Sequence, residues 1–527
     1  MDIIAVLSQE LSVPKTQIES AVKLMDEGNT IPFIARYRKE VTGGLDDTIL
    51  RNLEERLHYL RNLEKRKQEV LELIAASGKL DDKQMKQMQK ALEEAKMLSE
   101  VEDLYRPYKQ KRKTRASVAR EKGLEPLAKF MLMQKPGGDL EQEAARYVNA
   151  EKGVEDVEQA LSGAGDILAE EISDSAQIRS RLREDLQKNA QISTTKGTKE
   201  NQIYDMYLEY SESVRRIASH RILAIDRGER EEALKVSVEI DQQVCIGMIE
   251  NQVIHRNSPF AETLHAICED SFKRLIFPSL ERELRAQLTE KACAQAIGVF
   301  SENLKNLLMQ PPVKGCVTMG FDPAYRTGCK IAVVDETGKV LDTTVVYPTP
   351  PQNRTEQAKQ VLGSLIEKYG ITVIAIGNGT ASKESEIFVA ELLGELNPKL
   401  EHKVSYMVVS EAGASVYSAS KLGAEEFPQF DVSLRSAVSI ARRLQDPLAE
   451  LVKIDPKAIG VGQYQHDMPP KEMAAALGGV VEDCVKKVGV DFNTARQSPL
   501  SYAAGINTAD AKTIVLYPAA KRSFHKP

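Results

Sequence analysis

The chain has 527 residues, enough for several domains with buried cores, and its composition is that of an ordinary soluble protein. Hydrophobic residues make up 42% and charged residues 28%, which excludes a collagen-like or disordered chain. No run approaches the roughly 18 consecutive apolar residues of a membrane helix, and the N-terminus lacks the basic segment of a signal peptide. We therefore expect a cytoplasmic protein with no membrane partner.

The sequence also argues against several enzyme classes. The six cysteines form no CxxC pair, and the seven histidines form no HExxH or HxH motif, so zinc ribbons and common metal enzymes are disfavoured. Neither a GxxxxGK[ST] nor a GxGxxG phosphate loop occurs, and there is no GxSxG elbow. We expect buried, reduced cysteines, no bound metal and no cofactor.

The first 310 residues or so predict helices. Leucines recur every three or four residues over Asp46–Ser77, which predicts one long helix that Gly78 ends. A second helix is predicted over Asp82–Glu100, and the two should form an antiparallel hairpin.

Three later features divide this helical part. Gly-rich or polar breaks are predicted at residues 135–138 and 194–197. A β-tending run at Leu234–Val238 indicates a small hairpin. Helices then continue over residues 262–309 with an interruption at Pro278.

From Gly315 the pattern becomes that of strands alternating with helices. Strands are predicted at residues 317–321, 329–334, 340–347, 373–376 and 404–409, and helices at 355–369 and 383–396. This order predicts an α/β domain with a mixed sheet. After Pro447 the chain is helical again, with a polar linker at residues 460–468.

Acidic residues in the α/β domain suggest a nuclease-like site. Ribonuclease-H-like folds place a metal carboxylate at the end of their first strand and need three or four converging acids for two Mg²⁺ ions. Asp322 ends the first strand and Glu411 follows the last, while Asp431 and Asp446 are candidates for the third acid. Asp431 could equally be a helix N-cap. Because residues 377–379 offer Asn rather than an acid, we interpret the set as vestigial.

A basic segment at Tyr105–Arg115 combines cations with aromatic rings, which suits phosphate neutralisation and base stacking. A solvated charged loop would have the same sequence pattern. The candidate nucleic-acid-binding residues are Arg106, Tyr108, Lys109, Lys111, Arg112, Lys113 and Arg115. A second basic stretch at residues 31–40 is more simply explained by inward apolar packing, with Arg36, Arg38 and Lys39 facing outward.

Residues 500–514 match a helix-hairpin-helix, in which backbone N–H groups at a tight Gly-containing hairpin hold a phosphate without reading bases. An ordinary αα-turn is the alternative. The candidate contacts there are Gly505, Ile506, Asn507 and Lys512.

Several long stretches of this sequence resemble the Tex family of bacterial transcription accessory proteins, which is related to the eukaryotic elongation factor Spt-six. They are residues 30–46, 104–127, 320–328, 375–382, 410–420, 439–451 and 460–467. The resemblance extends from the N-terminus to Tyr517.

The resemblance implies a mainly α protein with an inserted α/β ribonuclease-H-like (YqgF) domain and a C-terminal helix-hairpin-helix. The implied domains are an N-terminal helical domain with a helix-turn-helix-like part (1–195), a central helical scaffold (196–312), the YqgF domain (313–446) and an incomplete helix-hairpin-helix region (447–527). The family's second hairpin and S1 domain are missing from this sequence, so we expect a shortened chain and weakened nucleic-acid affinity.

The resemblance also implies a binding scaffold for RNA and DNA without sequence preference, acting in transcription and RNA metabolism, whose YqgF domain does not catalyse. The alternative from the acid residues is a Mg²⁺-dependent nuclease. A third interpretation, a platform for RNA polymerase or ribosomes, stays open.

Overall fold

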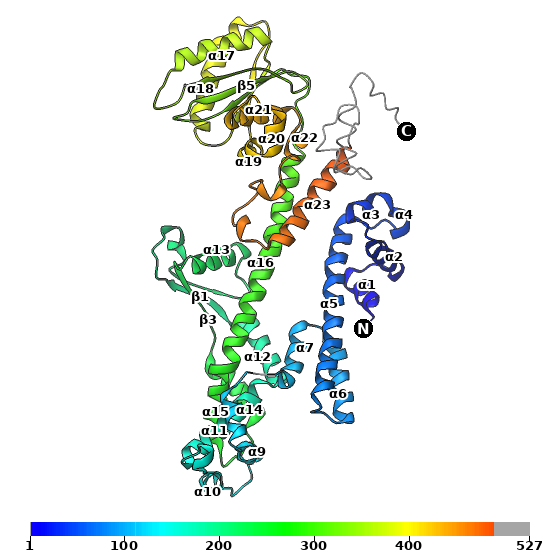
Figure 1. Cartoon of the computed structure of the whole chain (residues 1–527), viewed down its shortest axis with the longest axis vertical. Coiled ribbons are helices and arrows are strands. Elements are labelled where there is room, and N and C mark those ends of the chain that lie inside the picture. Colours follow the sequence, from blue (N-terminus) through cyan, green and yellow to red (C-terminus); the bar gives the residue numbers. More distant parts are fainter. Residues whose placement is uncertain (1, 111, 490–527) are drawn as a thin grey trace. The chain divides into compact units, whose positions relative to one another are not determined.

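The computed structural model describes residues 2–110 and 112–489 (Figure 1). Lys111 and the residue 500–514 segment, including Gly505, Ile506, Asn507 and Lys512, lie outside the described residues, as does the side chain of Arg36. The chain divides into two compact units, the first ending at Cys293 and the second beginning at Ala294. None of the described helices combines the length and the apolar sequence that crossing a bilayer requires.

The first unit is mainly helical. Its α-helices are α1 (Ile3–Leu11), α2 (Lys15–Asp26), α3 (Ile31–Tyr37), α4 (Lys39–Thr42), α5 (Asp47–Ser77), α6 (Asp82–Glu94), α7 (Leu98–Tyr105), α8 (Arg115–Glu121), α9 (Glu125–Met133), α10 (Leu140–Ala145), α11 (Val157–Ser173), α12 (Ala176–Asn189), α13 (Ser219–Arg230), α14 (Gln242–Val253), α15 (Ala261–Asp270) and the first part of α16 (Phe277–Leu308). Its strands are β1 (Gln191–Lys196), β2 (Glu209–Ser213) and β3 (Leu234–Glu239). Short helical turns are η1 (Arg106–Tyr108), η2 (Ala150–Lys152), η3 (Gln202–Tyr207) and the π-helical η4 (Ser271–Ile276).

The second unit contains the rest of α16 and one mixed sheet with its covering helices. Its strands are β4 (Thr318–Asp322), β5 (Cys329–Val334), β6 (Val340–Val346), β7 (Val373–Gly377) and β8 (Ser405–Val409). Its helices are α17 (Thr355–Tyr369), α18 (Ser382–Leu396), α19 (Ala414–Ala419), α20 (Lys421–Glu426), α21 (Val432–Gln445), α22 (Pro447–Leu451) and α23 (Pro470–Val488), with short turns η5 (Asn397–Lys399), η6 (Pro456–Ala458) and η7 (Gln465–Asp467).

The long helix is confirmed, but the second helix of the predicted hairpin ends earlier than expected. α5 begins after the N-cap Asp46 and stops at Gly78, as the leucine pattern predicts. α6 ends at Glu94, and the predicted continuation to Glu100 is wrong. The Glu100 carboxylate accepts hydrogen bonds from the backbone N–H groups of Lys96 (2.6 Å) and Met97 (3.1 Å), and these bonds start α7 instead.

Residues 194–197 were expected to break the helical region, and most of them form a strand. β1 is the central strand of a three-stranded antiparallel sheet with the order β2-β1-β3. The β-tending run at Leu234 is confirmed as β3, but its partner is β1, so the two do not form a local hairpin. Ile192, Ser193 and Thr194 are all buried, and because two of the three are polar, the sequence carries no hydrophobic alternation that would predict a strand.

Pro278 does not interrupt its helix. The π-helical turn η4 immediately precedes it and leads straight into α16. Proline lacks a backbone N–H and its ring collides with the preceding turn of an α-helix. The widened η4 turn accommodates this, so the chain continues as one helical rod.

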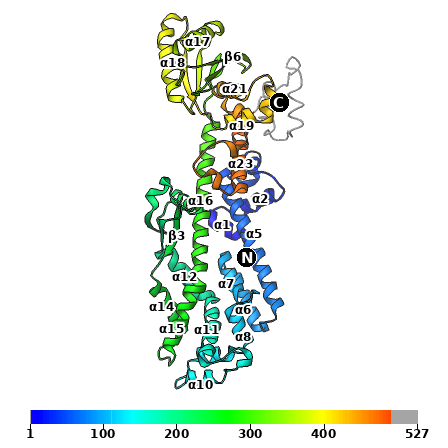
Figure 2. The same ribbon diagram turned by 60° about the vertical axis from the view of Figure 1, so that its left-hand side comes forward.

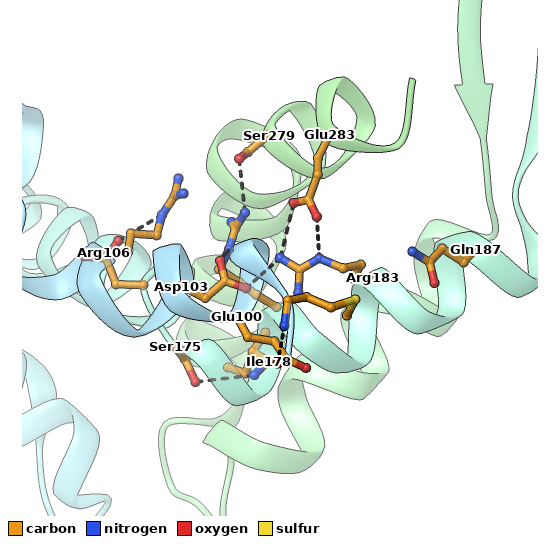
Figure 3. Close-up of polar contacts among 12 residues, drawn as sticks. Glu100, Asp103, Arg106, Ser175, Ile178, Arg183, Gln187, Ser279 and Glu283 are labelled. Carbon is orange, nitrogen blue, oxygen red and sulfur yellow. Dashed lines mark hydrogen bonds and ion pairs between the residues drawn. The ribbon is translucent and has the colours of Figure 1, made fainter. Parts of the chain in front are cut away.

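A buried charge cluster joins helices that are distant in sequence (Figure 3). Asp103 of α7 accepts hydrogen bonds from Arg179 Nε and Arg183 Nη2 of α12, each at 2.6 Å. Arg183 Nε also donates to Glu283 of α16 at 2.6 Å, and Arg179 Nη2 donates to Ser279 at 3.1 Å. Asp103, Arg179 and Arg183 are 3%, 2% and 7% exposed, so the two cations depend on these partners rather than on water.

The variant Asp103→Asn should therefore destabilise the first unit strongly. It leaves two buried guanidinium groups with one acidic partner, Glu283, and we expect a loss of about 3–5 kcal/mol in the free energy of unfolding. Asp26→Asn is the matched control, because Asp26 pairs with Arg61 in an exposed ion pair worth less than about 1 kcal/mol. Urea titrations of both variants would measure the difference, and equal midpoints would contradict the role given to Asp103.

The sheet of the second unit matches the predicted mixed α/β domain. Its order is β6-β5-β4-β7-β8, with β4, β5 and β6 antiparallel and β4, β7 and β8 parallel. One face packs against α17 and α18, and the other face packs against α21 (Figure 2). Gly320 permits the close approach of α21, because a Cβ there would lie 2.1 Å from the carbonyl oxygen of Ala437.

The predicted polar linker at residues 460–468 is a packed segment. Gln465 is 5% exposed; its side chain donates to the carbonyl oxygens of Lys457 and Ile459 and accepts from the N–H of Val461. Asn303 of α16 donates to the carbonyl oxygen of Val461 at 2.8 Å. The segment therefore lies on the C-terminal part of α16, where its backbone groups are satisfied.

None of the six cysteines forms a disulfide, and five of them are buried, as the sequence predicts. Burial raises the pKa of Cys245 and Cys268 to about 12, so these thiols stay protonated at neutral pH.

Candidate functional site: an acid pair at the carboxyl edge of the sheet

The second unit brings two acidic residues to one edge of its sheet. β4, β7 and β8 are parallel neighbours, so their carboxyl ends lie side by side. Asp322 is the last residue of β4, and Glu411 follows β8 by two residues. Between them lies the end of β7 with the sequence Gly377-Asn378-Gly379.

The glycines after β7 make room for the Glu411 carboxylate. A Cβ at Gly379 would lie 1.6 Å from Glu411 Oε1, and one at Gly377 would lie 2.8 Å from Oε2 and 3.3 Å from Pro323. The backbone N–H of Glu411 donates to Asn378 Oδ1 at 3.0 Å. Glu411 therefore reaches across β7 toward the end of β4, and Asn378 fixes its backbone instead of facing the site as a ligand.

Asp322 is largely buried beside this carboxylate. Burial raises the pKa of Asp322 to about 6; a hydrogen bond with Ser436 of α21 opposes the shift, and the negative charge of Glu411 adds to it. The negative charges of Asp322 and Glu411 repel each other, and two carboxylates are fewer than the three or four that a two-metal site needs.

The closing helix α21 supplies a cation where a third acid would be expected. Ser436, Ser439 and Arg443 recur at helical spacing on the face that packs against this edge, and all three are buried. Arg443 is 2% exposed, and its Nη1 donates to the carbonyl oxygens of Ser410 (2.9 Å) and Ala412 (2.7 Å), which flank Glu411. Burial lowers the pKa of Arg443 to about 10, while Glu450 and Glu411 act in the opposite direction. Arg443 therefore keeps its charge at neutral pH.

The other two acid candidates cap helices. Asp431 Oδ1 accepts from the N–H of Leu434 at 2.7 Å, which confirms the N-cap alternative for this residue. Asp446 Oδ1 accepts from the N–H of Ala449 at 3.0 Å and caps α22. Among the described residues no three acidic, histidine or cysteine side chains converge in a way that could hold a metal ion. The arrangement thus joins Asp322 to Glu411 and leaves Asp431 and Asp446 outside the pair.

The basic segment at Tyr105–Arg115 divides into a packed part and an exposed part. Arg106 Nε lies 3.4 Å from Asp174, and the ring of Tyr108 packs against the core of α1–α7. Lys109, Arg112, Lys113 and Arg115 are exposed. Arg106 and Tyr108 therefore contribute to packing, and the exposed cations are the side chains that a ligand could reach.

The stretch at residues 31–40 behaves as the packing interpretation expects. Ile31 and Ile34 are buried, while Arg38 and Lys39 are exposed. The guanidinium of Arg38 lies 5.0 Å from the centre of the Phe33 ring, so it is engaged locally.

The sequence reasoning missed Ser436 and Arg443. Both belong to a helix that was recognised, but only the register between α21 and the sheet shows that they face the acid pair. The sequence does contain a signal for Arg443. This residue lies on the apolar face of an amphipathic helix, which indicates that its side chain is buried.

Fold and site together define a mainly helical protein that carries a mixed α/β domain with an incomplete acid cluster. Comparison with protein families agrees over three segments. Residues 1–75 match the Tex-like protein N-terminal domain, residues 135–300 the Tex central region-like family, and residues 316–445 the Tex protein YqgF-like domain.

Individual relatives lead to the same assignment. The uncharacterized protein YdcI of Bacillus subtilis is 48% identical over 97% of this chain and 70% of its own length. The transcriptional accessory protein Tex of Neisseria gonorrhoeae is 47% identical, over 98% of this chain and 68% of its own length. The human S1 RNA-binding domain-containing protein 1 is 38% identical, over 98% of this chain and 52% of its own length. The chain belongs to the Tex family.

The raised pKa of Asp322 predicts a pH-dependent stability. The folded state holds the Asp322 proton up to about pH 6, whereas the unfolded chain releases it near its ordinary value of 3.8. The stabilisation from this proton is therefore complete below about pH 4 and is lost as pH rises through 6. We expect Asp322→Asn to exceed the wild type in stability at pH 8 by on the order of 2–3 kcal/mol, with a gap that narrows below pH 6.

Urea denaturation of the full chain at pH 5 and pH 8 would measure this gap. Asp446→Asn is the control, because its carboxylate is exposed and asparagine caps a helix about as well as aspartate. A gap for Asp322→Asn that stays constant with pH would contradict the environment described for Asp322.

Proposed function

We propose that this chain is a transcription accessory protein that binds RNA and DNA without sequence preference. The observation that carries the proposal is the group of exposed cations at Lys109, Arg112, Lys113 and Arg115. Exposed lysine and arginine side chains on a well-anchored loop neutralise phosphates and release counterions, which needs no contact with base edges. The chain's net charge of −6 means that such a local group has to supply the attraction.

Two further observations support a binding role. The named relatives include a transcriptional accessory protein and an S1 RNA-binding domain-containing protein. Among the residues that the structure describes, those near Asp322 and Glu411 do not provide the three or more carboxylates that a two-metal nuclease uses. The helix-hairpin-helix contacts at Gly505, Ile506, Asn507 and Lys512 remain a prediction, as does any contact with RNA polymerase or ribosomes.

A charge-removal experiment tests the basic loop. We expect the triple variant Lys109→Ala, Arg112→Ala, Lys113→Ala to bind a labelled single-stranded RNA at least about tenfold more weakly at low salt, with a shallower salt dependence. Fluorescence anisotropy over a series of salt concentrations, with RNA and DNA of several sequences, measures both quantities.

The matched control is Lys83→Ala, Lys86→Ala, Lys90→Ala on α6, where three exposed lysines of the same unit are removed. If both triple variants lose affinity equally, the attraction is a property of total charge and the loop is not the binding site. If neither loses affinity, the proposal for residues 109–113 is wrong.

The convergence of Asp322 and Glu411 supports one alternative function, a Mg²⁺-dependent nuclease. We expect no cleavage of RNA, RNA–DNA hybrid or junction substrates with Mg²⁺ or Mn²⁺. The reason is that the positive charge of Arg443 beside Glu411 disfavours the binding of two divalent metal ions. Cleavage that requires metal and disappears in Asp322→Asn, with nucleic-acid binding unchanged, would establish the nuclease instead.

A further inference from the structure

A groove crosses α11 in the first unit, beside the basic loop. Its section next to α8 has a volume of about 690 Å³, and its section next to α15 has a volume of about 940 Å³. The two sections form one continuous groove, because they share the lining residues Arg115, Glu158, Ser162 and Asp166. Lys113 of the basic loop also lines the section next to α8. The groove therefore has the size of a small-ligand site and begins at cations that the proposed function already uses.

Two glycines of α11 allow the neighbouring elements to form the walls of this groove. A Cβ at Gly163 would collide with the side chain of Leu124, and a Cβ at Gly165 would lie 3.4 Å from Ile267 of α15. Larger residues at these positions would force the packed elements apart. Because α11 packs against both α8 and α15, the groove is part of the fixed packing of these helices.

The charge of the lining changes along the groove. Lys113 and Lys122 line only the section next to α8, and the exposed Arg115 lies where the two sections meet. Glu141 lines only the section next to α15, and Glu158 lies at the junction; both glutamates are exposed. An anionic group is therefore attracted to the section next to α8 and repelled from the other section.

The remaining acidic side chains of the lining are engaged within the protein. Asp166 and Asp270 both form ion pairs with Arg274, which offsets much of their charge. Asp156 caps the N-terminus of α11 through its side chain, where the helix dipole stabilises a negative charge. The cations next to α8 can therefore act on a ligand without being neutralised by these three carboxylates.

The section next to α15 has an apolar lining. Val157 and Leu161 of α11 and Ala266 and Ile267 of α15 contribute to it. A nucleotide has a matching division, because its phosphate is anionic and the flat faces of its base are apolar. A single strand therefore fits the groove in one sense, with its phosphates in the cationic section and a base in the apolar section.

We propose that this groove seats an unpaired nucleotide of a bound strand, with the phosphate at Lys113 and Arg115 and the base against the apolar lining next to α15. The inference rests on the proposed function, because the basic loop has to attract the strand. A base inside a duplex is covered by its neighbours and cannot enter, and contact with the face of a base requires no particular sequence. A cationic peptide would be repelled by Lys113 and Arg115, and an acidic peptide by Glu141 and Glu158.

An abasic strand separates contacts to bases from contacts to phosphates. We expect the full chain to bind a labelled single-stranded DNA of mixed sequence about tenfold more tightly than an abasic strand of the same length and charge. This factor corresponds to the burial of roughly 60 Å² of apolar base surface. Contacts to phosphates alone predict equal affinities. Fluorescence anisotropy at low salt measures the affinity for each strand.

Filling the groove should remove this difference. The double variant Ser162→Leu, Ala266→Leu places larger side chains at two exposed positions of the lining, and we expect it to bind both strands with the affinity that the wild type has for the abasic strand. The matched control is Gln177→Leu, Ala261→Leu, which adds two leucines at exposed positions of α12 and α15 outside the lining. It should keep the tenfold difference, and circular dichroism should show that both variants are folded.

The outcomes distinguish the groove from the loop. If the wild type binds the two strands equally, the groove takes no base and the proposed function stands on the loop alone. If the groove-filling variant keeps the tenfold difference, the bases are held elsewhere and the inference is wrong. A groove that receives a peptide gives one of these two results. Equal losses in both double variants would also contradict it, because the effect would belong to added leucines in general. A wild-type chain that binds neither strand would contradict the proposed function itself.

Discussion

One buried carboxylate organises the first unit. Asp103 satisfies two guanidinium groups that would each cost several kcal/mol if they were left without a partner in the protein interior. Because these arginines belong to α12 and one of them also binds Glu283 of α16, the cluster fixes α7 against two distant helices. η1 and the basic loop follow α7 directly, and Arg106 adds a further tie to Asp174. The position of the exposed cations thus depends on a buried charge cluster.

The α/β domain shows the opposite use of charge. Its edge retains the strand ends that bring Asp322 and Glu411 together, but the helix that closes the site contributes serines and an arginine. A site that holds two divalent cations needs an excess of negative charge. Here Arg443 offsets one carboxylate and burial keeps Asp322 partly protonated near pH 6. The net charge of this edge can therefore be close to zero without a bound metal ion. The domain consequently needs no metal to offset repulsion between carboxylates, which explains how the fold persists without the full set of acids.

The sequence predicted best what depends on local periodicity. The buried runs of β5 and β7 and the leucine pattern of α5 identified those elements, and the end of α5 at Gly78 followed from the need for a left-handed C-cap. It failed where long-range contacts decide. β1 is a strand because β2 and β3 flank it, and Gln465 is buried because a distant part of α16 receives its segment. At the site, Asp322 and Glu411 could be predicted from strand ends, whereas Arg443 required the register of α21.

An acidic chain can still present a polyanion with an attractive surface, because the net charge does not determine the local field where exposed cations gather. Arg56, Arg61 and Arg66 each bind a carboxylate within the first unit, and Arg274 and Arg285 do the same farther along. The electric fields of the two opposite charges in such an ion pair nearly cancel at the distance of a bound phosphate backbone, and salt weakens what remains. Cations that are exposed and close in sequence add instead of cancelling. The local field over residues 109–115 is therefore a better guide to binding than the net charge of the chain.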